Sequence, residues 1–237
     1  MRRTIGYALD FLLDTLDYSP DEPGIPANEA DLRLQPSADP MQKDQYCIIL
    51  WNDDKHSFDE VIQLLCDTTN REHADATSLA HTIDENGREI VDMNTNAARL
   101  LEIAQVISKI ELGVTVRRAY DTFREQVSMV IIEWLVDLTR SRLGTDILVI
   151  REAIAAELLS PRRRESNMYG SGPQIPDLSS DIPNPCRIDW LLLYHTRLWK
   201  KPRMSLKETY ASILTLSHSH KVAIGKNAYG RWSLRAK

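Results

Sequence analysis

The sequence predicts an α+β protein, in which a small domain of strands and helices is followed by an all-helical segment. Three observations predict this fold class. An apolar run at residues 46–51, rich in β-branched and aromatic side chains, is typical of a buried strand and stops at Asn52-Asp53-Asp54. Ser57 and Glu60 then form a capping-box pattern, which begins a helix. Between residues 119 and 159, apolar side chains recur at helical spacing.

Composition limits the function classes. The 237 residues are 43% hydrophobic, which suits one large domain or two small ones. The net charge of −5 does not imply a nucleic-acid partner. The three cysteines form no C-x-x-C pair and join the six histidines in no zinc spacing, so we expect reduced thiols and no metal or other cofactor in this chain. No apolar stretch approaches the ~20 residues of a membrane span, so we expect no membrane partner and a cytoplasmic or nuclear location.

The chain around residues 45–117 is expected to hold helices and linkers. Residues 1–17 have the pattern of an amphipathic helix that packs on a neighbouring segment, and residues 18–44 form a Pro-rich linker. Residues 118–160 are predicted to be a helical scaffold, and residues 161–186 a flexible linker.

Three finer predictions concern particular residues. Residues 187–237 are expected to hold a pair of helices separated by Pro202. The basic cluster Arg162-Arg163-Arg164 is expected to lie in a solvated loop. The last helix of the small domain is expected to bury a stripe of four residues, Ile103, Val106, Ile107 and Ile110.

An ordered set of motifs spans residues 45–117. In chain order these are a strand ending in Asn52-Asp53-Asp54, a helix from Ser57, the helix end Thr82 to Gly87, a strand over 88–93, a helix from Thr95 and a strand over 113–116. Their order resembles the ClpS-type domain, in the form found in UBR-family E3 ubiquitin ligases (N-recognins) of fungi. The flanks at 27–40 and 189–210 also look like those ligases. The resemblance implies a ClpS-like β-α-α-β-α-β domain at residues 45–117.

The resemblance also implies a site that binds the free N-terminus of a polypeptide. Asn52 matches the residue that meets the first backbone groups of the substrate, and Asp53 matches the carboxylate that receives the α-ammonium. Asp84 stands where the bacterial adaptors have His, and His56 is expected to take part from the same turn as Asp53. The walls of the hydrophobic pocket are expected to be Trp51, Phe58, Val61, Ala80, Ile83 and Val114.

The implied partners are N-degron proteins that begin with Phe, Trp, Tyr, Leu or Ile. The chain itself looks non-catalytic, since it carries no RING-type zinc cluster and no cysteine in a thioester-transfer motif. We therefore expect a substrate-recognition region of a longer ligase. The ubiquitin-conjugating enzyme would bind through other regions of that ligase, and zinc would belong only to its UBR box and RING.

Two alternatives compete with this interpretation. The fold could be a scaffold whose pocket is degenerate, filled by Phe58 and Trp51. Alternatively, the carboxylates Asp53, Asp54, Asp84 and Glu85 could serve a hydrolase or bind a hard cation. The spacing of a calcium loop, with its Gly and terminal Glu, is absent from these residues.

Overall fold

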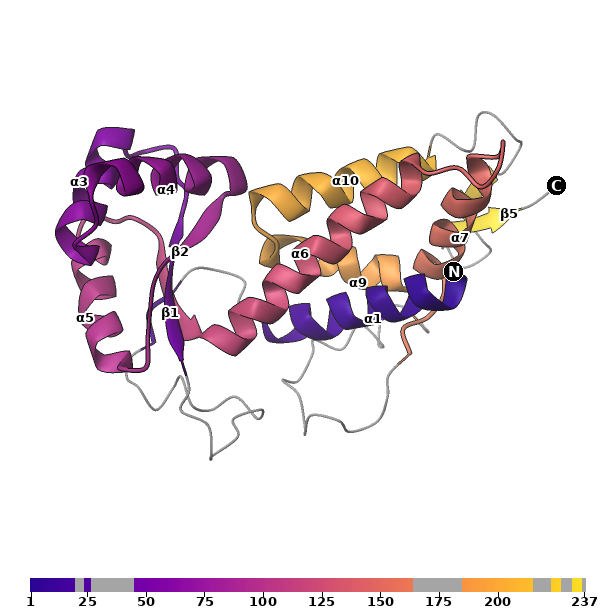
Figure 1. The fold of residues 1–237 in the computed structure, drawn as a ribbon. Coiled ribbons are helices and arrows are strands. Elements are labelled where there is room, and N and C mark those ends of the chain that lie inside the picture. Colours follow the sequence, from indigo (N-terminus) through magenta and orange to yellow (C-terminus); the bar gives the residue numbers. More distant parts are fainter. Residues whose placement is uncertain (20–23, 27–44, 164–184, 215–222, 227–231, 236–237) are drawn as a thin grey trace. The chain divides into compact units, whose positions relative to one another are not determined.

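The computed structural model describes residues 1–19, 24–26, 45–163, 185–214, 223–226 and 232–235 (Figure 1). These residues divide into two units. The sheet unit comprises Pro20–Arg124 and Trp199–Lys201, and the helical unit comprises Met1–Ser19, Glu125–Leu198 and Pro202–Lys237. Of the predicted linker at residues 18–44, most lies outside the described residues, as do the flank at 27–40 and residues 164–184.

The sheet unit has the predicted β-α-α-β-α-β order. Its elements are β1 (Tyr46–Trp51), α3 (Phe58–Thr69), α4 (His73–Asn86), β2 (Arg88–Asn94), α5 (Ala97–Ser108) and β3 (Val114–Arg118). The strands form an antiparallel sheet in the order β2-β1-β3, so β1 is central. The prediction of an α+β fold with this domain is confirmed.

The two faces of the sheet differ in what covers them. Ile48 and Leu50 of β1 lie opposite Val116 and Val114 of β3, and all four side chains are buried in a core shared with α3, α4 and α5. Those three helices lie on one side of the sheet in Figure 1. Side chains alternate between the two faces along a strand, so Ile49 and its neighbours at odd positions of β1 face the other side.

The predicted stripe of α5, the last helix of the small domain, is confirmed for Ile107 and wrong for Val106 and Ile110, while Ile103 is partly buried. The buried residues are Ala97, Leu100, Ala104 and Ile107, whereas Val106 is 45% and Ile110 39% exposed. The helix begins after Asn96, whose side chain accepts a hydrogen bond from the Arg99 amide. The prediction failed because it followed the largest side chains, while two alanines supply half of the buried face.

The helical unit is built mainly from helices that share one core. They are α1 (Arg2–Tyr18), α6 (Ala119–Arg140, whose first residues belong to the sheet unit), α7 (Leu148–Leu158), α9 (Arg187–Leu193), the 3-10 turn η1 (Tyr194–Arg197) and α10 (Lys200–Leu214). The apolar face of α1 packs into this core, so the neighbour expected for that helix lies in the same chain. A short antiparallel hairpin, β4 (Ala223–Lys226) and β5 (Trp232–Arg235), corrects the prediction of an all-helical segment.

Pro202 does not separate two helices. It lies in the first turn of α10, which begins at Lys200. Proline is tolerated there because the first amides of a helix have no partner within it. The predicted helix before Pro202 is instead shorter, since α9 ends at Leu193 and continues as η1.

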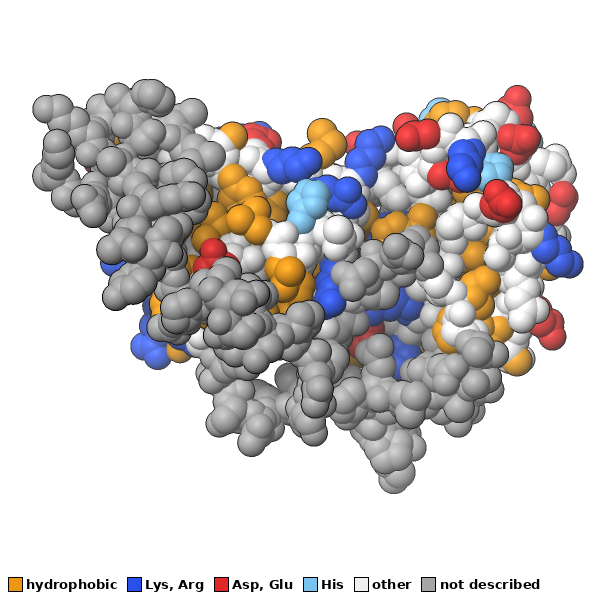
Figure 2. All heavy atoms as spheres, turned by 180° about the vertical axis from the view of Figure 1, so that it is seen from behind, with side chains coloured by type: hydrophobic (Ala, Val, Ile, Leu, Met, Phe, Trp, Pro, Cys, Tyr) orange, Lys and Arg blue, Asp and Glu red, His pale blue; other side chains and the backbone are white. Residues whose placement is uncertain are grey.

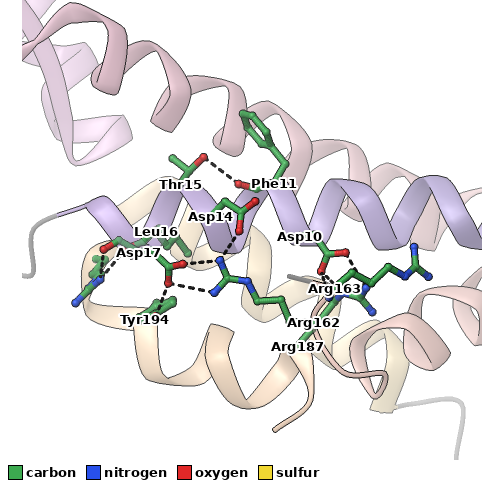
Figure 3. A network of polar contacts seen from close by, with 11 residues as sticks. Asp10, Phe11, Asp14, Thr15, Leu16, Asp17, Arg162, Arg163, Arg187 and Tyr194 are labelled. Atoms are coloured by element: carbon green, nitrogen blue, oxygen red, sulfur yellow. Dashed lines mark hydrogen bonds and ion pairs between the residues drawn. The ribbon is translucent and has the colours of Figure 1, made fainter. Parts of the chain in front are cut away.

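Ion pairs tie α1 to later parts of the helical unit (Figure 3). Arg162 is paired with Asp14 and Asp17, and its side chain is only 5% exposed, so the prediction of a solvated loop is wrong for this arginine. Arg187 is fully buried and binds Asp10 through two nitrogens, at 2.7 and 2.8 Å. The sequence pattern did not indicate this burial, because the acidic partners of Arg162 lie some 150 residues away in the chain.

Figure 2 shows one face of the molecule, where side chains of both charges lie among hydrophobic ones. Within the part of the chain that the structure describes, no helix has both the length and the apolarity to cross a membrane.

Candidate functional site

A hollow lies where β1 ends in the sheet unit. The amide of Trp51 donates to the carbonyl of Gly113, and the amide of Asn52 donates to that of Gly87, at 2.8 and 3.0 Å. These bonds bring together the end of β1, the start of α3, the end of α4 and the turn before β3. The residues that line the hollow are Leu50, Trp51, Asn52, Asp53, His56, Phe58, Val61, Ala80, Ile83 and Leu112.

The turn between β1 and α3 is held by its own side chains. Asp53 Oδ1 accepts hydrogen bonds from the amides of Lys55 and His56, both at 3.0 Å. Ser57 caps α3 by accepting from the Glu60 amide, and Glu60 accepts in return from the Ser57 amide, so the predicted capping box is confirmed. Since all these bonds are local, the sequence alone fixes the shape of this turn.

The imidazole of His56 joins two parts of the site. Its Nδ1 lies 2.8 Å from Asp53 Oδ2, and its Nε2 lies 2.8 Å from the carbonyl oxygen of Ile110, in the turn between α5 and β3. A carboxylate and a carbonyl can only accept, so both bonds form together only when both ring nitrogens carry a proton. The arrangement therefore favours a positively charged imidazolium, which braces the Asp53 turn against the turn that carries Leu112.

The pKa values of this pair follow from the same contacts. The hydrogen bond to Asp53 raises the pKa of His56 against an opposing effect of burial, and the bond to the Ile110 carbonyl raises it further. Burial alone would raise the pKa of Asp53, but hydrogen bonds from the backbone and side chain of His56 and from the Lys55 amide together lower it. The pair is thus stabilised as carboxylate and imidazolium.

Asn52 and Asp84 form a second polar contact beside the hollow. Asn52 Nδ2 donates to Asp84 Oδ1 at 3.0 Å. Asp84 is not among the residues that line the hollow, and its side chain is 50% exposed. Of the Asn52 side-chain atoms, Oδ1 is then the one suited to accept a hydrogen bond from a ligand.

The apolar wall includes five of the six predicted residues and two that were not predicted, Leu50 and Leu112. The predicted ones that line the hollow are Trp51, Phe58, Val61, Ala80 and Ile83. Val114 does not line it, whereas Leu112 does, although both side chains are buried in the core of the sheet unit. Leu112 precedes Val114 by two positions, so the period of a strand could have indicated it.

Trp51 and Phe58 both line the hollow, and their rings also contact residues that do not line it. The indole of Trp51 donates to Thr115 Oγ1 at 2.9 Å, and Thr115 pairs with Ile49 on the sheet face opposite to Leu50. Phe58 is 43% exposed, and its ring lies 4.8 Å from that of His81.

The carboxylates are not arranged as a metal site. Among the described residues, no group of three or more His, Cys, Asp or Glu side chains gathers in a way that could hold a metal ion. Asp54 and Glu85 are exposed, while Asp53 and Asp84 are engaged by His56 and Asn52. This geometry offers no support for the hydrolase or cation alternative.

Comparison with known proteins identifies the domain that carries this site. Residues 41–111 match the family model described as ATP-dependent Clp protease adaptor protein ClpS. This segment is a ClpS-like domain. The motifs that predicted it, from Asn52-Asp53-Asp54 onward, all lie within or directly beside the matched residues.

Two curated relatives extend the comparison. The chain is 25% identical over 294 aligned residues to the E3 ubiquitin-protein ligase ubr1 of Schizosaccharomyces pombe. This alignment covers 95% of the chain and 15% of that protein. It is 41% identical over 51 residues to the E3 ubiquitin-protein ligase UBR1 of Drosophila melanogaster, which covers 22% of the chain and 3% of that protein. The resemblance to the ClpS-like region of UBR-family ligases is therefore confirmed, and the chain spans a small part of those relatives.

Proposed function

We propose that the ClpS-like domain binds the free N-termini of proteins that begin with Phe, Trp, Tyr, Leu or Ile. In this proposal the chain is the substrate-recognition region of an E3 ubiquitin ligase of the N-degron pathway. One observation carries the proposal: Asn52 and Asp53, with His56 beside them, line a hollow whose seven other lining residues are apolar. A polar edge beside an apolar hollow matches a ligand with a cationic end and a hydrophobic first side chain.

Asp53 has room for such a cation. A carboxylate offers roughly four lone-pair positions. In Asp53, the Lys55 amide, the His56 amide and the His56 ring use three of them. An α-ammonium that donates to the remaining position forms a charge-assisted bond, which is the strong kind. The imidazolium of His56 limits this gain, because its positive charge lies against the same carboxylate.

The apolar wall supports the proposed preference for bulky side chains. Burying a Leu or Phe side chain contributes about 1.5–3 kcal/mol, and each hydrogen bond that involves a charged group adds about 1.5–3 kcal/mol. N-acetylation removes the cation and leaves the Asp53 edge without a partner from the ligand. Discrimination between free and blocked N-termini is therefore expected to exceed discrimination among hydrophobic side chains.

Ubiquitin transfer is assigned to other regions of the ligase. Among the described residues, no group of three or more His, Cys, Asp or Glu side chains could hold a metal ion, and the aligned part of the S. pombe relative is 15% of that protein. The ubiquitin-conjugating enzyme and the zinc-binding modules would belong to those regions. This division of labour makes the chain a selector of substrates.

The proposal is tested by fluorescence anisotropy with a labelled peptide that begins with Phe. Asp53→Asn should weaken binding at least tenfold, because the ammonium and the His56 imidazolium would then share a neutral side chain. Asp54→Asn is the matched control, since Asp54 is exposed and does not line the hollow. Equal binding by wild type and Asp53→Asn would overturn the assignment of the site. A folded protein that binds no such peptide would favour the scaffold alternative.

A further inference from the structure

Three residues from a distant part of the sequence belong to the sheet unit. Trp199–Lys201 follow η1, far beyond the matched segment 41–111, yet they group with the ClpS-like domain rather than with the helical unit. Their contacts within the sheet unit lead to Asn52 by two routes, one through Trp199 and one through Lys200.

The first route is a stack of three side chains. The Arg88 guanidinium lies 3.5 Å from the ring centre of Trp199 and 5.0 Å from that of Trp51. Arg88 and Trp199 are both buried. Cation–π contacts are stronger when the groups are shielded from water, as they are here. Arg88 is also the pairing partner of Trp51 across β1 and β2. The stack therefore holds the last residue of β1, directly before Asn52.

The second route runs along the end of α4. Lys200 Nζ donates to the Asp84 carbonyl at 2.6 Å and lies 3.6 Å from Asp84 Oδ1, which accepts from Asn52 Nδ2. The backbones are also in close contact. A Cβ added to Gly87 would lie 2.5 Å from Lys200 Cβ, and the Gly87 carbonyl accepts the amide of Asn52. Gly87 has φ +93°, so a glycine is required there on both grounds.

We propose that Trp199 and Lys200 are positioning residues of the N-terminus-binding site, and that Lys200 acts through Asp84 on the side-chain amide of Asn52. The inference rests on the proposed function of that site. It extends the site to residues outside the ClpS-like segment, and it names the purpose of the Asp84 carboxylate. Asp84 turns the Asn52 amide so that its carbonyl oxygen can meet the ligand, and Lys200 holds Asp84.

The sign of the effect separates positioning from simple electrostatics. Removal of a positive charge near the site would, by charge alone, strengthen the binding of a cationic N-terminus. Loss of positioning weakens it. The Lys200 and Asp84 side chains are 48% and 50% exposed, so their pair contributes little to the free energy of unfolding. Affinity should therefore change while the melting temperature does not.

The test compares full-length variants by anisotropy with the Phe peptide. Lys200→Met should raise the Kd about two- to fivefold, as expected for the loss of one exposed charged contact. Lys200→Arg should restore binding, because it keeps the charge and the reach. Lys207→Met is the control, since it removes an exposed lysine of α10. Unchanged or tighter binding by Lys200→Met would overturn the inference.

A double-mutant cycle tests the route through Asp84. In the Asp84→Asn background, Lys200→Met should change the Kd by less than about twofold, because the carboxylate that transmits its effect is gone. The side-chain amide resonances of Asn52 should shift in Lys200→Met and stay in place in Lys207→Met. A full effect of Lys200→Met in the Asp84→Asn background, or unmoved Asn52 resonances, would refute the route. If the wild type itself binds no peptide, the failure lies with the proposed function.

Discussion

Two carboxylate–cation pairs, one in each unit, show how similar chemistry serves different ends. In the helical unit, Asp10 and Arg187 bind through two hydrogen bonds and are almost completely buried. In the sheet unit, Asp53 and His56 are bound by one side-chain bond and are 24% and 15% exposed. The buried pair leaves its carboxylate no access to a ligand. The exposed pair keeps one face of Asp53 open beside an apolar hollow.

The comparison indicates that burial decides the role of a charged pair. A pair removed from water fixes which helices meet, since an unpaired charge there would be costly. A pair at the surface contributes less to stability but can exchange partners, which is what ligand binding requires. Four predictions test this contrast, from the largest expected effect to the smallest.

Removal of one partner of the buried pair should have the largest effect. Arg187→Met leaves the Asp10 carboxylate buried without its cation and should lower the free energy of unfolding by about 3–5 kcal/mol. Urea denaturation followed by circular dichroism measures this loss. The double variant Asp10→Leu with Arg187→Met should recover much of it, because the buried Asp10 charge is gone and Glu157, which also contacts Arg187, keeps its pair with Arg163. A loss below about 1 kcal/mol in Arg187→Met would show that the pair does not hold the helical unit.

Truncation of the wall of the hollow should separate binding from packing. Leu112→Ala should destabilise the sheet unit by about 2–3 kcal/mol and also weaken binding of the Phe peptide. Val114→Ala is the matched control, since Val114 is equally buried but does not line the hollow. It should destabilise without changing the affinity of the folded protein. Equal loss of affinity in both variants would mean that Leu112 acts only through the core.

The pH dependence of stability should reveal the charge of His56. The pKa of His56 is raised in the folded protein, so its stabilising contribution is fully present below about pH 6.5 and is lost as the pH rises through the folded pKa. The pKa of Asp53 is lowered in the folded protein, so its effect on stability has the opposite pH dependence. The stabilisation that Asp53 contributes is lost as the pH falls through its folded pKa.

Urea denaturation at a series of pH values measures the loss of stability at high pH and the loss at low pH. His56→Gln should remove the loss of stability at high pH, because glutamine does not titrate. The difference between wild type and this variant isolates His56 from His195, whose pKa is lowered by burial and by Arg203 and Lys207. Identical pH profiles for the two proteins would mean that His56 is not an imidazolium in the folded state.

Disruption of an exposed pair should have the smallest effect. Arg140 and Glu208 form a contact of 2.5 Å, but their side chains are 61% and 47% exposed. Arg140→Met should change the free energy of unfolding by at most about 1 kcal/mol. The same denaturation experiment checks this value. A loss as large as that in Arg187→Met would contradict the rule that burial sets the energetic role of a pair.

The features that could be predicted from the sequence are those held by short-range contacts. The Asp53 turn and the capping box are held by hydrogen bonds between residues two or three positions apart, so local chemistry determined them. The order of strands and helices came from the family resemblance, which the fold confirms. The same reasoning identified Asn52, Asp53 and His56 as neighbours at one edge of the hollow.

The features that failed depend on contacts between distant residues. The sequence could not show that Arg162 meets Asp14 and Asp17, or that the indole of Trp51 turns away from the helices toward Thr115. The stripe on α5 was misplaced because alanines carry little hydrophobic signal yet allow close packing. The approach of Trp199 to Arg88 follows no local pattern at all, and only the fold reveals it.

The central claim is that the hollow recognises a free N-terminus, and one calorimetric comparison tests it most directly. Wild-type protein is titrated with a peptide that begins with Phe, once with a free amine and once N-acetylated. The free peptide should bind with micromolar affinity, about −8 kcal/mol, and the acetylated peptide at least tenfold more weakly. Equal affinity for the two peptides would contradict the claim, because Asp53 would then make no contact with the terminal ammonium.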